Sequence, residues 1–253
     1  MAIIDKLTTI ANTIRSKNGT TNTMTLDEMS NAIKNIQTGV ITSDNRCTTI
    51  PDYLFFDCRN LDLTELPSGI TSIGDDAFRN CVNLSLTELP SGITYIGYNA
   101  FSGCVKLALT ELPSGITNIR SSAFFGCTNL ALTKLPSGIT SIEDWTFYNC
   151  TNLALTDLPP GITNIDVYAF ASCTKLALTE LPSGITNIGE NAFENCTNIH
   201  SLTFKGTPNA IDATAFQGCA NLTTINVPWA EGAVENAPWG ATNATINYNY
   251  VAV

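Results

Sequence analysis

A cysteine that returns every 23 residues constrains the fold of this chain more than any other feature. The eight regularly spaced cysteines are Cys58, Cys81, Cys104, Cys127, Cys150, Cys173, Cys196 and Cys219. A fixed period between about 20 and 50 residues is typical of a solenoid, because one unit cannot bury its own apolar face and must stack on its neighbours. We therefore expect function to be carried by a repeated surface.

Apolar residues recur at the same places in every unit. In the unit from 81 to 103, Leu84 and Leu86 alternate as in a strand, and Pro90 with Gly92 turns the chain before a second short apolar pair. A phenylalanine ends this pattern in each unit, and we predict that these rings stack inside the core. They are Phe55, Phe78, Phe101, Phe124, Phe147, Phe170, Phe193 and Phe216.

The repeated pattern CxxLxLTxLPSGITxIxxxAFxx resembles the BspA-like leucine-rich repeat over about two thirds of the chain. The resemblance implies a leucine-rich-repeat solenoid of about eight coils, mainly β with short helical or 3-10 turns. One departure leaves the strand register of the middle coils open. Six residues after the cysteine, where we expect an apolar strand residue, these units have Thr87, Thr110 or Thr133. The last units return to the commoner spacing, with Leu202 and Ile225.

The segment 1–36 predicts a small α-helical hairpin in front of the repeats. Ile3, Leu7 and Ile10 fall on one helical face, and Thr25 with Glu28 forms a capping box for a second helix. Two helices this short bury too little surface to be stable alone. We expect them to cap the solenoid, or to attach to or trimerise within a larger assembly.

Both ends of the chain also resemble tail proteins of phages and prophages of Gram-positive bacteria. For the hairpin, the segments 5–15 and 25–33 carry the resemblance, which implies other tail proteins as partners of residues 1–36. The segment 37–57 reads as a linker and an N-terminal capping coil, 58–228 as the solenoid and 229–253 as an aromatic C-terminal cap. In this cap the rings shield the last rung, and carbohydrate stacking is their alternative role. They are Trp229, Trp239, Tyr248 and Tyr250.

Charge and hydropathy exclude several classes of partner. The formal net charge is −10 and the isoelectric point is about 4.4, which argues against nucleic acid and anionic membranes because both need a basic surface. The sequence contains no run of about eighteen apolar residues, so we predict no membrane insertion. The N-terminus does not read as a secretory signal, and this favours a virion protein made in the host cytoplasm over a bacterial cell-surface protein.

The residues that could carry chemistry do not form a catalytic pattern. The cysteines occupy a packing column, no CxxC pair exists, and His200 is the only histidine, so we predict no metal site and no cofactor. We also predict no enzymatic activity. The remaining alternative is a row of acids that collects a cation or acts on a glycan, and a solvated face is the simpler interpretation. The row contains Glu65, Glu88, Glu111, Lys134, Asp157 and Glu180.

The units differ mainly in the three residues before the Ala-Phe step and the one after it, which we call the variable edge. Its Tyr, Trp, Arg, Ser and Asn residues are typical of adaptable recognition surfaces, although a loop that tolerates any residue is the alternative. Together with one neighbouring strand tyrosine, Tyr95, we predict a ligand-binding ribbon. Its residues are Asp75, Asp76, Arg79, Tyr95, Tyr98, Asn99, Arg120, Phe125, Asp144, Trp145, Tyr148, Tyr168, Glu190 and Glu194.

These observations predict a binding protein that recognises a bacterial surface protein or glycan. The phage resemblance implies a receptor-binding component of a phage tail, located on the virion. The alternative is a BspA-like adhesin on the bacterial cell surface, and a glycan-active enzyme ranks third.

Overall fold

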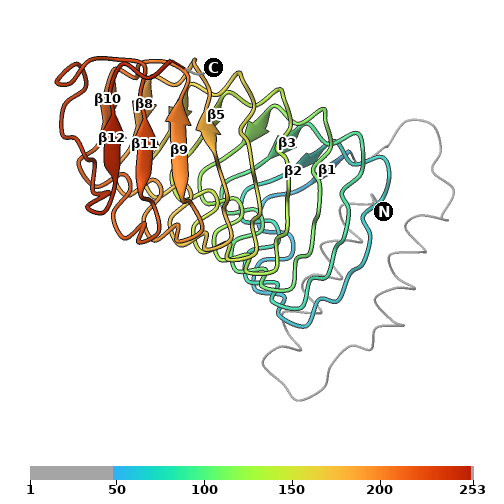
Figure 1. The fold of residues 1–253 in the computed structure, drawn as a ribbon. Helices are drawn as coiled ribbons and strands as arrows, with labels where there is room; N and C mark the ends of the chain where they lie inside the picture. Colours follow the sequence, from blue (N-terminus) through green and yellow to red (C-terminus); the bar gives the residue numbers. More distant parts are fainter. Residues whose placement is uncertain (1–47, 252–253) are drawn as a thin grey trace, which may run out of the picture.

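The computed structural model describes residues 48–251, which form a β-solenoid of about nine coils (Figure 1). The predicted hairpin 1–36 and most of the linker lie outside the described residues. The coils follow one another from the N-terminal to the C-terminal end as a stacked array, so residues 23 apart in the sequence are neighbours in space.

One face of the solenoid carries a two-residue strand per coil, and every pairing is parallel. The first sheet has the order β1-β2-β3-β4 and the second has the order β10-β8-β6-β5. In each of these strands the second residue, an isoleucine, points into the core. The strands are β1 (Thr49–Ile50), β2 (Ser72–Ile73), β3 (Tyr95–Ile96), β4 (Asn118–Ile119), β5 (Ser141–Ile142), β6 (Asn164–Ile165), β8 (Asn187–Ile188) and β10 (Ala210–Ile211).

A third sheet forms on another face in the C-terminal coils, where its arrows lie side by side (Figure 1). Its order is β12-β11-β9-β7. Its strands are β7 (Glu180–Leu181), β9 (Ser201–Phe204), β11 (Thr224–Asn226) and β12 (Thr245–Asn247).

The strand expected at Leu84 and Leu86 does not form, and this answers the question of register in the middle coils. Both leucines are fully buried, but the segment is irregular, and the bond from Ala108 N to Leu86 O (3.1 Å) repeats along the coils. Leu89, three residues after Leu86, is buried as well. On this face strands form only toward the C-terminal end, first as the short β7, which still follows the early leucine, and then as the four-residue β9, where the commoner spacing returns.

The phenylalanine column stacks through the core as predicted. Successive ring centroids lie 5.1 to 5.6 Å apart with interplanar angles of 2 to 13°. No ring in the column is more than 2% exposed. The rings therefore hold consecutive coils together and are unavailable to a ligand.

The cysteine column is buried and unoxidised, and it also carries hydrogen bonds that we did not predict. The thiol of Cys104 donates to the carbonyl oxygen of Phe78 at 3.0 Å, and that of Cys127 donates to Phe101 at 3.1 Å. In each case the accepting phenylalanine lies one coil earlier than the one next to the cysteine in sequence. The column thus links neighbouring coils as well as filling space.

The C-terminal segment extends the solenoid beyond the end predicted at residue 228. Strand β12 pairs in parallel with β11, so the solenoid continues by one coil beyond residue 228. Trp229 and Trp239 are 6% and 0% exposed, with their ring centroids 6.3 Å apart. They shield the last coil, and the alternative of a carbohydrate platform built on these tryptophans is wrong because their faces are covered by the core.

Candidate functional site

The variable edge and the residue that follows it form a tight turn. This turn places two residues of nearly every coil in the left-handed backbone region. The position directly before the cysteine holds only Gly, Asn, Asp or Ser, which are small or bond their own backbone. The other position is the third residue of the variable triplet, with φ of 51 to 59°. It is occupied by Tyr53, Asp76, Asn99, Ser122, Trp145, Tyr168 and Asn191.

Trp145 and Tyr168, like Tyr53 in the first coil, are unusual occupants of this turn, with φ of 59° and 53°. A left-handed conformation costs an ordinary side chain about 1–2 kcal/mol, and bulky residues rarely adopt it. Asn99 and Asn191 show that the same turn forms with a residue that suits it. The fold does not require large rings at these two positions, and strain retained at such places points to function.

Four rings meet on this edge across neighbouring coils, and we call Phe125, Trp145, Tyr148 and Tyr168 the aromatic cluster. Trp145 stacks on Tyr168 with ring centroids 4.1 Å apart, and Phe125 stacks on Tyr148 at 4.8 Å. Trp145 also contacts Tyr148 at 4.9 Å, which joins the two pairs. All four side chains are only partly buried. The structure therefore brings together four of the six aromatic residues of the predicted ribbon, and Tyr98 contacts Arg120 instead.

Asn191 supports the cluster from the next coil. Its side chain is 8% exposed and its Nδ2 donates to Tyr168 Oη at 2.8 Å. Its Oδ1 is buried and accepts no hydrogen bond from residues 48–251. A buried acceptor without a donor is costly, by about 1–3 kcal/mol, and such groups are rare in native structures.

The two arginines of the ribbon are paired within the chain. Arg79 contacts Asp76 at 3.0 Å, and Arg120 contacts Glu143 at 2.6 Å. Arg120 also donates to Tyr98 Oη and lies 4.7 Å above that ring. The other oxygen of Glu143 accepts from the backbone and hydroxyl of Ser121. Arg120 and Glu143 therefore join two coils at the place where the first sheet ends with β4 and the second begins with β5.

Several predicted ligand-binding residues have structural partners instead. Asp75 Oδ1 accepts from Tyr98 N at 2.9 Å, and Asp144 Oδ1 accepts from Val167 N at 2.9 Å. Asp76 is 6% exposed. Asp75 and Asp144 bind the next coil and Asp76 is buried, so these three side chains stabilise the edge.

The remaining predicted residues flank the cluster at different exposures. Tyr95 is half-buried in β3, where burial and then Asp75 raise the pKa of its hydroxyl. Asn99 is half-buried at a left-handed position. Glu190 is exposed and Glu194 is partly exposed, both in the coil of Asn191.

Asp166 and Glu143 belong to the site, but they were missing from the predicted set. Both occupy the first position of the variable triplet, where several other units have glycine, so that substitution was the available signal. Burial, followed by the charges of Asp144 and Glu143, raises the pKa of the Asp166 carboxyl. The edge therefore carries a local concentration of negative charge.

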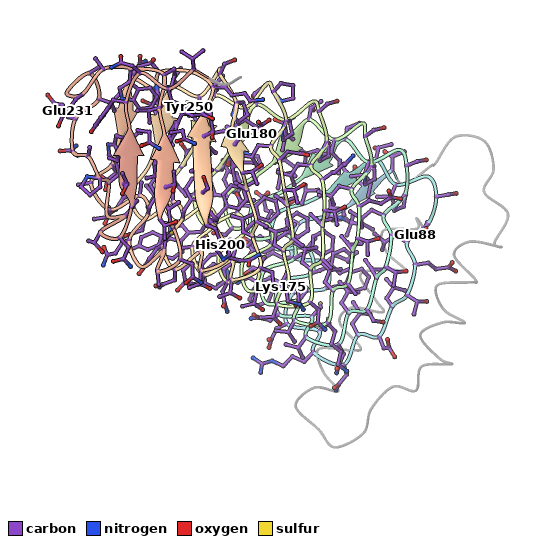
Figure 2. All side chains as sticks on the ribbon, in the orientation of Figure 1. Glu88, Lys175, Glu180, His200, Glu231 and Tyr250 are labelled. Atoms are coloured by element: carbon purple, nitrogen blue, oxygen red, sulfur yellow. The ribbon has the colours of Figure 1, made fainter. Side chains whose placement is uncertain are left out.

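Other candidate chemistry is dispersed. His200 lies on the outside of the coils (Figure 2), with its Nδ1 2.9 Å from Asn198 O. Glu65, Glu88 and Glu111 line an open groove of about 810 Å³, and Figure 2 shows Glu88 projecting outward. Within residues 48–251 no cluster of three or more His, Cys, Asp or Glu side chains could hold a metal ion. The same part of the chain contains no helix able to cross a membrane.

The repeat and its coils place the chain in a family. The BspA type leucine rich repeat region matches residues 29–154 and 117–236, with six copies, and the chain belongs to this family. The Leucine Rich Repeat protein of T. pallidum is 33% identical, with a TM-score of 0.58, and covers 72% of this chain and 86% of its own.

Two further solved structures are similar. A leucine rich cell surface protein from Faecalibacterium prausnitzii A2-165 is 26% identical, with a TM-score of 0.58 over 74% of this chain, which spans 61% of that protein's length. A leucine-rich repeat protein from Bacteroides ovatus ATCC 8483 is 22% identical, with a TM-score of 0.52 over 83% of this chain and 67% of its own, and shares the fold. No curated protein sequence gives a significant match.

Proposed function

We propose that this chain is a non-enzymatic binding protein of the bacterial cell surface, an adhesin whose recognition surface is the aromatic cluster. The observation that carries the proposal is the pair Trp145 and Tyr168, stacked at 4.1 Å in a backbone conformation that disfavours both residues. Family membership and the similarity to a leucine rich cell surface protein support the location. This proposal agrees with the alternative prediction from the sequence, a BspA-like adhesin on the bacterial cell surface.

Replacing Trp145 and Tyr168 by asparagine tests this function. We expect the labelled full chain to be retained on at least one class of immobilised target, namely bacterial cells, host cells or surface glycans. The double variant should be retained at least about tenfold more weakly, as for a hot spot worth more than 1.4 kcal/mol. Binding is measured by quantitative fluorescence over a range of protein concentrations.

Two controls separate binding from folding. Tyr250→Asn removes an exposed ring that is not part of the cluster and should bind as the wild type does. In the double variant, relief of the left-handed strain offsets the lost stacking, which is worth about 0.5–1.5 kcal/mol, so the free energy of unfolding should change little. Loss of binding together with a stability loss above about 3 kcal/mol would make the rings structural.

A receptor-binding role in a phage tail is our second proposal. It rests on the resemblance of residues 5–15 and 25–33 to phage tail proteins, and it includes attachment through residues 1–36. We expect the full chain to be a trimer and a chain beginning at Val40 to be a monomer. Size-exclusion chromatography with light scattering measures both. Monomers in both cases would count against assembly through the hairpin.

A further inference from the structure

We propose that the aromatic cluster binds a cationic segment of a partner protein, with an arginine or lysine side chain placed over Trp145 and Tyr168. This inference rests on the proposed function, because it names the chemistry of the partner for the same surface. The sequence analysis left a protein and a glycan equally open as targets.

The charges around the cluster are unbalanced. The arginines of the variable edge are already neutralised, Arg79 by Asp76 and Arg120 by Glu143. Four acids of the variable edge lie in the coils of Trp145 and Tyr168 or in the next coil, and none of them forms an ion pair within residues 48–251. They are Asp144, Asp166, Glu190 and Glu194. A field of one sign beside a low-dielectric surface attracts a partner of opposite charge and fixes its orientation.

The rings of the cluster also lack the covering that other rings on the variable side have. Arg120 lies 4.7 Å from the centroid of Tyr98, and Arg79 lies 5.9 Å from that of Phe56. In the described part of the chain, no arginine or lysine lies over a ring of the cluster. An aromatic face bounded by carboxylates is where a cation binds well, and an arginine from a partner would repeat the arrangement that the chain makes by itself at Tyr98.

Hydrogen-bonding capacity favours the same partner. The carboxylates of Asp166, Glu190 and Glu194 present acceptors at the surface. A guanidinium or ammonium group has donors only, so it matches this surplus. A sugar hydroxyl can also donate to a carboxylate, but it carries no positive charge to balance the acids. The surface therefore suits a basic peptide better than a neutral glycan.

A fluorescein-labelled peptide of nine arginines is the probe, and fluorescence anisotropy with the full chain measures its affinity. We expect binding that weakens as salt increases, because the charges are at the surface. Trp145→Asn should weaken it about tenfold, within the range of a desolvated cation–π contact. Replacing Asp166, Glu190 and Glu194 by their amides should weaken it at least as much.

The matched control replaces Glu65, Glu88 and Glu111 by glutamine, which changes the net charge equally on a different surface. Equal weakening by both triple variants would reduce the effect to net charge and overturn the proposal. No peptide binding, combined with Trp145-dependent binding of a neutral oligosaccharide such as cellohexaose or Trp145-dependent retention on cells, would overturn this inference alone. Retention on cells that does not depend on Trp145 would overturn the proposed function itself.

Discussion

Replacing Phe124 by alanine is expected to lower the free energy of unfolding by about 3–5 kcal/mol. The ring is 0% exposed, and its centroid lies 5.5 Å from that of Phe101 and 5.6 Å from that of Phe147. Its removal leaves a cavity at two interfaces between coils, and the stability of a repeat protein is approximately the sum of such interfaces and its units. Urea unfolding followed by far-ultraviolet circular dichroism measures the loss.

Phe125→Ala is the matched control, because the two phenylalanines are adjacent in sequence. Phe125 is only partly buried and stacks on Tyr148 at 4.8 Å, so we expect its loss to cost less than about 1.5 kcal/mol. The contrast separates core rings from surface rings. Similar costs for both variants would show that the aromatic cluster is part of the core, against its assignment as a binding surface.

Alkaline pH is expected to unfold the solenoid within about two pH units above the ordinary pKa of a thiol, about 8.5. Burial raises the pKa of seven column thiols, with that of Cys219 raised to about 12. Their folded pKa values lie above the unfolded value, so this contribution to stability is complete below about pH 8.5 and is lost as pH rises. Above that pH each thiol lowers the free energy of unfolding by about 1.4 kcal/mol per pH unit, and the seven together lower it by about 10 kcal/mol per pH unit. A typical domain is stable by about 5–15 kcal/mol.

Circular dichroism between pH 7 and 11, with a reducing agent present, follows this unfolding. Tyrosines and lysines also titrate near pH 10, so a variant with alanine at Cys104, Cys127 and Cys150 isolates the thiols. Because three thiols are gone, the slope of its stability against pH should be shallower than that of the wild type by about 4 kcal/mol per pH unit. Its stability at pH 7 is lower, because the substitutions leave cavities. The same pH slope in both chains would contradict a role of the thiols.

The limits of prediction are clearest on the Leu84 face and at the C-terminus. Alternation at Leu84 and Leu86 indicated a strand, but two leucines spaced for a strand do not by themselves form one. Leu181 follows the same early leucine and still pairs with β9, so pairing depends on the neighbouring coil. The tail after residue 228 lacks the repeat motif, so its pairing through β12 could be seen only once β11 was in place.

The sequence predicted where the site lies better than it predicted which residues form it. Variation among otherwise identical units located the edge, and it located Trp145, Tyr148 and Tyr168. It could not tell a presented acid from one that bonds the next coil, as Asp144 and Asp75 do. It also omitted Asn191 and Asp166, whose importance comes from contacts across coils.

The sequence by itself determined the solenoid, its 23-residue period, the buried phenylalanine and cysteine columns and the edge on which the coils differ. These follow from a repeat, because identical units that each bury one apolar face must stack in register. The tertiary structure alone decided the left-handed turn under Trp145 and Tyr168, the pairing of Arg120 with Glu143 and the stacking of the four rings across coils. Backbone conformation and contacts between coils depend on distances in space, which spacing along the chain does not specify.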